Sequence, residues 1–125
     1  MKEQVEKLKE IEKEICESKG SFDLFALFLR EDTTEWDLII SSDWARLDKK
    51  AAIKHIVEKI KKVFSDQEML MLSRLIILDK DNTALEAIHS AIQVEHGLAE
   101  VSNSAFFGLA IKHAYLITSK RQVHS

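Results

Sequence analysis

Cysteine and glycine are scarce in this chain, proline is absent, and no long apolar run occurs. The single cysteine, Cys16, cannot form an internal disulfide. Without a CxxC partner it indicates neither a redox pair nor a zinc site, so we expect a small buried hydrophobe. The three glycines, Gly20, Gly97 and Gly108, are isolated, which excludes a glycine-rich phosphate loop. No apolar run approaches the roughly 20 residues that a membrane-spanning helix needs.

A strong excess of charge of one sign is also lacking, because the formal net charge is only -3. Nucleic-acid-binding modules usually present a clustered Lys/Arg face, and the basic cluster near the end of this chain, Lys120 and Arg121, is short. DNA and RNA are therefore disfavoured partners. Residues 1–19 are charged throughout and lack the apolar core of a secretory signal, so we expect a cytoplasmic protein that does not associate with membranes.

Length and composition indicate one globular domain. The chain has 125 residues, of which 46% are hydrophobic and 31% charged, and a chain of this size can bury most of its apolar side chains. We expect a single domain over residues 1–125. It should begin with a helix within residues 1–20 and end in a tail, residues 120–125, that frays.

Residues 2–19 have the period of an amphipathic helix. The apolar residues Val5, Leu8, Ile11 and Ile15 form a narrow stripe among Lys and Glu, and Gly20 supplies the stop. Salt bridges along such a helix contribute only a few tenths of a kcal/mol each. The helix therefore needs a surface to pack on, which is either its own sheet or a partner.

Two segments with apolar residues at every second position follow. In residues 22–31 both alternating sets are largely apolar, which is typical of a strand covered on both faces. One predicted set is Phe22, Leu24, Ala26 and Phe28, and the other is Phe25, Leu27 and Leu29. A polar loop separates this strand from residues 36–40, so we expect an antiparallel hairpin.

The middle of the chain alternates between helical and strand patterns. Residues 51–64 carry apolar side chains at helical spacing and are the clearest helix in the chain. Ser65 and Glu68 match a capping box that opens a short turn before a third strand, residues 74–78. Thr83 and Glu86 repeat that spacing before a helix that runs to about residue 93.

The last third reads as strands, over residues 98–101 and 109–118, with a polar stretch at 102–104 and a bulge or bend at Gly108. We expect the long strand to place Leu109, Ile111, Tyr115 and Ile117 on one face and Ala110, Ala114 and Leu116 on the other. The predicted fold is α+β in the order αββαβαββ, with a mixed, largely antiparallel sheet of about five strands flanked by about three helices.

Several stretches of the sequence are similar to one group of proteins. FDLFALFLRED, WDLIISSDW, LSRLIILDK, VEHG and FFGLAIKHAYLITSKR resemble a family of small uncharacterised prokaryotic proteins, and the likeness covers most of the chain beyond residue 20. The resemblance implies a free-standing domain. It implies no reaction, cofactor or catalytic residue.

Acidic residues follow the second and third predicted strands. A strand, helix, strand crossover makes these strands parallel, so their carboxyl ends share one edge of the sheet, where open sheets bind ligands. The candidate ligand-binding residues at this edge are Ser42, Asp43, Trp44, Asp79 and Asp81. Three carboxylates on two loops can coordinate a hard cation such as Mg²⁺. No cofactor is otherwise expected.

The same residues have a plainer interpretation. Asp43 or Asp48 can cap the second long helix, and Asp81, Asn82 or Thr83 can cap the third. Trp44 can be a packing residue rather than a platform for a ligand. The metal hypothesis predicts that Mg²⁺ or Mn²⁺ raises the melting temperature and that Asp79→Asn removes this effect.

Histidines suggest a second candidate site for acid–base chemistry. Glu95 and His96 follow the third helix, and His113 lies next to Lys112 on the last strand. Against this, His96 can simply interact with the helix dipole. Lys112 and His113 should point to opposite faces of the strand unless a bulge intervenes. The catalytic residues therefore stay open.

Two classes of function follow. The leading hypothesis is a protein-interaction or self-associating module, most simply a homodimer, because the last strand carries apolar residues on both faces and needs cover if it lies at the end of the sheet. The alternative is a metal-dependent enzyme or ligand-binding domain that uses the acidic edge. A nuclease-like core fits the element order, but no Glu-x-Lys motif occurs in a predicted strand.

Overall fold

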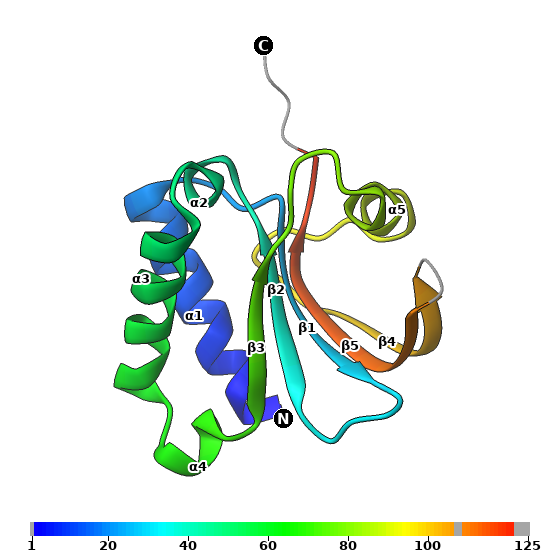
Figure 1. The fold of residues 1–125 in the computed structure, drawn as a ribbon, viewed down its shortest axis with the longest axis horizontal. Coiled ribbons are helices and arrows are strands. Elements are labelled where there is room, and N and C mark those ends of the chain that lie inside the picture. The colour runs from blue at the N-terminus through cyan, green and yellow to red at the C-terminus, as the bar shows by residue number, and fades with distance from the viewer. Residues whose placement is uncertain (1, 107–108, 122–125) are drawn as a thin grey trace.

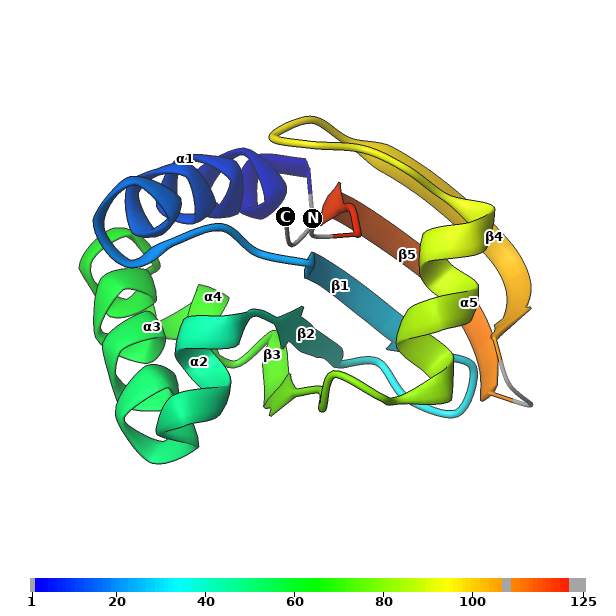
Figure 2. The same ribbon diagram turned by 90° about the horizontal axis from the view of Figure 1, so that it is seen from above.

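A five-stranded mixed sheet lies between helices on both faces (Figures 1 and 2) in the computed structural model, which describes residues 2–106 and 109–121. One face is covered by α1 and α3, and the other by α5. In chain order the elements are α1 (Lys2–Lys19), β1 (Leu24–Arg30), β2 (Trp36–Ser41), α2 (Asp43–Leu47), α3 (Lys49–Val63), α4 (Asp66–Met69), β3 (Leu72–Ile77), α5 (Thr83–Ala91), β4 (Ala99–Phe106) and β5 (Leu109–Ser119). The predicted fold class and element order are confirmed, with α2 and α4 as short additional helices.

The strands lie in the order β3-β2-β1-β5-β4. β2 and β3 are parallel, as the crossover through α3 requires, and the other neighbours are antiparallel. In the middle of the sheet Leu27 of β1 lies opposite both Leu38 of β2 and Tyr115 of β5. The carboxyl ends of β2 and β3 therefore share one edge, while β1 starts there.

Polar side chains set the start of α2 and α3. The Ser42 hydroxyl accepts a hydrogen bond from the backbone N–H of Ala45, and the Asp48 carboxylate accepts one from that of Ala51. Each bond satisfies an N–H group that has no partner inside its helix. Residues 42–48 thus contain one short helix with its cap, and Asp48 is the cap of the next helix.

One of the two predicted capping boxes forms. Ser65 and Glu68 exchange side-chain and backbone hydrogen bonds at the start of α4, as predicted. The box predicted for Thr83 and Glu86 is wrong because Asn82 is the N-cap of α5, its side chain accepting from a backbone N–H two residues on. Thr83 is therefore already the first helical residue.

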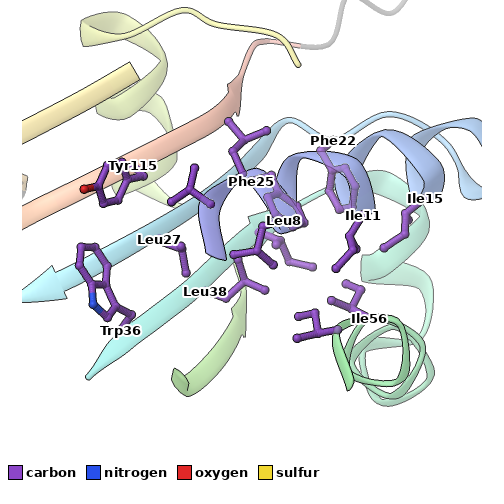
Figure 3. Close-up of a cluster of buried hydrophobic side chains, with 14 of the residues drawn as sticks. Leu8, Ile11, Ile15, Phe22, Phe25, Leu27, Trp36, Leu38, Ile56 and Tyr115 are labelled. Atoms are coloured by element: carbon purple, nitrogen blue, oxygen red, sulfur yellow. The ribbon is translucent and has the colours of Figure 1, made fainter. Parts of the chain in front are cut away.

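The hydrophobic core has two parts, one on each face of the sheet. The larger part lies between the sheet and helices α1 and α3 (Figure 3), and the smaller lies between the sheet and α5. As predicted, β1 supplies both, with Phe25 and Leu27 in the larger part and Leu24, Ala26 and Phe28 in the smaller. The apolar stripe of α1 packs against the protein's own sheet. Phe22, which precedes β1, packs in the larger part, contrary to its predicted place.

The prediction for Ile111 is also wrong. Pairing of β5 with β1 passes from His113 directly to Ile111, so the register shifts at Lys112. Such a bulge changes which face the following side chains occupy. Ile111 therefore lies in the smaller core part with Ala114, whereas Tyr115 lies in the larger one. Gly108, where we predicted a bend, is outside the described residues.

β5 lies inside the sheet, between β1 and β4. The polar stretch at 102–104, predicted as a break, belongs to β4, which pairs with β5 along its length. A dimer was expected to cover the final strand at the end of the sheet, and this position of the strand is wrong. Self-association itself stays a prediction. In the part of the chain that the structure describes, no helix is long and apolar enough to cross a bilayer.

One smaller expectation also needs correction. Cys16 is partly exposed rather than buried, and its thiol donates to the Ser21 hydroxyl. Fraying of the tail stays a prediction, and at its start the backbone N–H of Lys120 donates to the main-chain oxygen of Asp23 at 2.9 Å. The chain is thus held to the start of β1 just after β5 ends.

Candidate functional site

A hollow of about 270 Å³ lies at the edge where β2 and β3 end. Asp43 follows β2 and Asp81 follows β3, so the parallel pairing of these strands brings both carboxylates to the same hollow. The start of α5 forms another wall. The lining residues are Asp23, Asp43, Lys80, Asp81, Asn82, Leu85, Glu86, His89 and Arg121. Two of the five predicted edge residues thus face one cavity.

Asp23 is almost fully buried beside the hollow, with 6% of its surface exposed. Its Oδ2 accepts hydrogen bonds from Arg46 Nη2 at 3.1 Å and from the Ser41 hydroxyl at 3.2 Å. Arg46 also donates to Ser41 Oγ at 2.6 Å and to Asp43. A buried carboxylate needs such a partner because desolvation penalises an unpaired charge. Arg46 therefore compensates Asp23 and holds Asp43 at the rim.

His89 is a lining residue that sequence reasoning missed. It lies on the buried face of α5 with Leu85 and Ile88, and its Nε2 is 2.8 Å from the main-chain oxygen of Asp23. A carbonyl oxygen can only accept, so Nε2 carries the hydrogen and the neutral ring keeps Nδ1 as an acceptor. The helical spacing from Leu85 could have indicated that His89 faces inward.

The other three edge residues have structural partners. Ser42 is buried as the cap of α2. The Trp44 ring packs edge-on against Phe22 at 5.8 Å between centroids. The Asp79 carboxylate accepts a hydrogen bond from Lys49 Nζ at 2.7 Å, and this contact lowers the pKa of Asp79. None of the three lines the hollow.

The charges around the hollow have both signs. Asp43, Asp81 and Glu86 are acidic, whereas Lys80 and Arg121 are basic. Arg121 Nη2 lies 3.8 Å from Glu86 Oε1, and both side chains are largely exposed. Among the described residues, no three His, Cys, Asp or Glu side chains gather closely enough to hold a metal ion. Binding of Mg²⁺ stays a prediction without a ligand cluster to support it.

Glu95 and His96, of the second predicted site, have separate partners. The Glu95 carboxylate accepts from Lys120 Nζ at 3.1 and 3.2 Å. His96 Nδ1 lies 2.7 Å from Oε2 of Glu12, a fully buried residue of α1, whose Oε1 accepts from the Thr118 hydroxyl at 2.9 Å. The two neighbours in sequence therefore do not converge on one site. Glu12 was missed because, in the sequence, it looks like one more of the many charged residues of an amphipathic helix.

His113 lies between two side chains of the neighbouring strand. Its Nδ1 is 2.9 Å from the Ser102 hydroxyl oxygen, and its Nε2 is 2.7 Å from Oε1 of Glu100. Ser102 is directly opposite His113 in the β4–β5 ladder. Glu100, two residues before Ser102, points to the same face. Sequence reasoning named His113 but neither partner, because the register of β4 on β5 was not known.

Comparison with known proteins assigns neither site. No family model, curated protein or solved structure matches this chain. The resemblance to small uncharacterised prokaryotic proteins therefore stays a prediction.

Proposed function

We propose that this protein binds a small polar molecule that carries both a cationic and an anionic group, in the hollow at the carboxyl ends of β2 and β3. The observation that carries the proposal is that acidic and basic side chains line a single cavity of about 270 Å³. Open sheets bind ligands at this position, where loops after parallel strands meet. The volume suits a small ligand, since pockets for drug-sized molecules start at about 300 Å³.

The distribution of charge supports a ligand with both signs. Asp23 is already neutralised by Arg46, so it adds little net field. Asp43, which also bonds to Arg46, and Asp81 can accept hydrogen bonds from an ammonium or guanidinium group. Lys80 and Arg121 can donate to a carboxylate or phosphate group. One ligand that spans the hollow would satisfy both sets.

The ion pair between Arg121 and Glu86 is no obstacle to a ligand. Both side chains are more than half exposed, and such surface pairs contribute little to stability. Arg121 can therefore exchange Glu86 for an anionic ligand group at small cost. Leu85 and His89, which are both buried, complete the lining of the hollow with one apolar and one polar residue.

The experiment compares doubly and singly charged probes. 4-Aminobutyrate and L-arginine serve as ligands with both signs, and butylamine and butyrate as matched probes with one. A probe at ten times its Kd should raise Tm by about 5 °C. Asp81→Asn and Arg121→Gln should remove the rise, whereas Asp66→Asn, an exposed carboxylate on α4, should not.

Three outcomes would contradict the proposal. These are no rise with any doubly charged probe, equal rises with the singly charged probes, or equal loss in Asp66→Asn. A rise with Mg²⁺ or Mn²⁺ alone that disappears in Asp79→Asn would instead support the metal-binding alternative. Isothermal titration of each variant gives the affinities directly.

A further inference from the structure

A polar cluster lies on the face of the sheet opposite α5, away from the hollow. The β4–β5 ladder places Ser102 opposite His113 and Glu100 opposite Tyr115. Trp36 of β2 lies in the same cross-strand row as His113, because Leu29 of β1 pairs with both. Trp36 and Tyr115 form the end of the larger core part that is farthest from Ile15 and Ile56 (Figure 3).

The hydrogen bonds of His113 fix the direction of its protons. Glu100 as a carboxylate only accepts, so Nε2 of the neutral ring carries the hydrogen that lies 2.7 Å from Oε1. Nδ1 is then a lone-pair acceptor, 2.9 Å from the Ser102 hydroxyl. Ser102 therefore donates its hydroxyl proton toward a base, and that base is oriented by an acid. This arrangement activates a serine as a nucleophile.

Neighbouring rings hold the histidine in place. The Tyr115 ring lies 4.7 Å from the His113 ring, and the Trp36 ring contacts it edge-on at 6.1 Å. Burial first, and then the Glu100 charge, raises the pKa of the Tyr115 hydroxyl. Such support keeps the base in the position needed for proton transfer.

The cluster is also reachable from solvent. The His113 side chain is 24% exposed and that of Glu100 is 46% exposed. Residues that only stabilised the strand pair would need these hydrogen bonds but no access to solvent. A nucleophile needs the hydrogen bonds and must also be reachable by its substrate.

We propose that Ser102 is a nucleophile activated by His113, and that this cluster transfers acyl groups from small activated esters to water. The Ser102 oxygen attacks the carbonyl carbon while its proton passes to His113 Nδ1. The carbon–oxygen bond to the leaving alcohol then breaks, and the alcohol takes that proton. This leaves an acyl group on Ser102.

Water completes the cycle. His113 accepts a proton from the water molecule that attacks the acyl carbon, the bond to Ser102 breaks, and Ser102 recovers its proton. The sum is ester plus water giving acid plus alcohol, with no oxidant or cofactor. Glu100 and Tyr115 are positioning residues, because they act through His113.

The test measures the reactivity of individual serines in the intact chain. A fluorophosphonate probe loses fluoride as its phosphorus bonds to a serine oxygen, and peptide mass spectrometry identifies the labelled residue. Ser90 is the internal control, because it is exposed and its hydroxyl donates to the main-chain oxygen of Glu86 instead. General-base assistance is worth about 10²–10⁴-fold, so we expect Ser102 to be labelled at least about tenfold faster than Ser90.

Variants connect the reactivity to the cluster. His113→Gln and Glu100→Gln should lower the Ser102 rate to that of Ser90, and Ser102→Ala should remove hydrolysis of 4-nitrophenyl acetate. Equal labelling of Ser102 and Ser90 in the wild-type protein would overturn the proposal whether or not any variant folds. An unchanged Ser102 rate in a folded Glu100→Gln protein would do the same. Urea-unfolded wild-type protein should show no difference between the two serines.

Discussion

Replacement of Glu12 by alanine should destabilise the protein far more than its position on a charged helix suggests. Glu12 is 0% exposed, and its two oxygens bond to the Thr118 hydroxyl of β5 and to His96 Nδ1. It thus connects α1 to the last strand and to the segment before β4. Removing it leaves Thr118, which is 2% exposed, without this acceptor.

The size of the effect follows from the burial of each partner. The proton of the buried Thr118 hydroxyl loses its acceptor, although the hydroxyl oxygen still accepts from the backbone N–H of His96 at 3.2 Å. An unpaired buried donor costs about 1–3 kcal/mol, and the lost methylene about 0.8 kcal/mol. The side chain of His96 is 38% exposed, so water can replace its hydrogen bond to Glu12. Loss of that bond therefore adds little to the destabilisation. Glu12→Ala also removes the desolvation cost of the buried carboxylate, and this gain offsets part of the loss. We expect Glu12→Ala to lower the free energy of unfolding by about 2–3 kcal/mol.

Urea unfolding followed by circular dichroism measures this difference. With a slope of about 1.5 kcal/mol per molar urea, the midpoint should fall by about 1.3–2 M. Glu10→Ala is the matched control, because it removes the same charge from an exposed position of α1. A double-mutant cycle of Glu12→Ala with Thr118→Val should show coupling. Equal midpoints for Glu10→Ala and Glu12→Ala, or the absence of coupling, would refute the reasoning.

Two further predictions concern a titrating group and the core. Hydrogen bonds from Lys7 first, and then from the Ser65 backbone and Gln4, lower the pKa of Glu68 from 4.5 to about 2. The contribution of Glu68 to stability is therefore complete above pH 4.5 and is lost as the pH falls toward 2. Lys7→Gln should therefore shift acid unfolding to higher pH, whereas Lys13→Gln, at an exposed position, should not. In the core, Ile56→Ala should cost about 3–4 kcal/mol in urea unfolding, because Ile56 is fully buried. Val63→Ala should lower the free energy of unfolding by less than about 1 kcal/mol, because Val63 is 46% exposed. Similar losses at both positions would contradict the packing described for α3.

Periodicity was sufficient to predict the elements that bury a complete face. The stripe of α1 and the two apolar faces of β1 follow from side-chain spacing alone, since an element with that spacing can bury its apolar residues in only one way. The parallel pairing of β2 and β3 followed from the crossover rule. These features depend on residues close together in sequence and on general geometry.

Features that depend on one residue's register could not be predicted. The shift at Lys112 inserts one residue into the pairing of β5 with β1, without a glycine or proline to mark it. α2 spans only Asp43–Leu47 and is too short to show a helical period. Asn82 and Thr83 are both good helix caps, and only the backbone conformation decides between them.

The candidate hollow was predicted in part for the same reason. Asp43 and Asp81 follow strands whose parallel pairing could be inferred, so their meeting could be inferred too. Asp23 and Arg121 come from the start of β1 and from beyond the end of β5. They reach the hollow because the antiparallel pairing of these two strands brings Leu24 opposite Ser119. That register is a property of the folded sheet.

Both predicted acid–base histidines bond to carboxylates distant in sequence rather than to their charged neighbours. His96 contacts Glu12 while Glu95 contacts Lys120, and His113 contacts Glu100 across the ladder. The reason for His113 is geometric, because successive side chains on a strand diverge while opposite residues lie about 5 Å apart. A histidine on a strand should therefore be evaluated with the residues that face it on the next strand. By that criterion the serine whose reactivity most deserves measurement is Ser102, eleven residues from His113 along the chain and 2.9 Å from it in the fold.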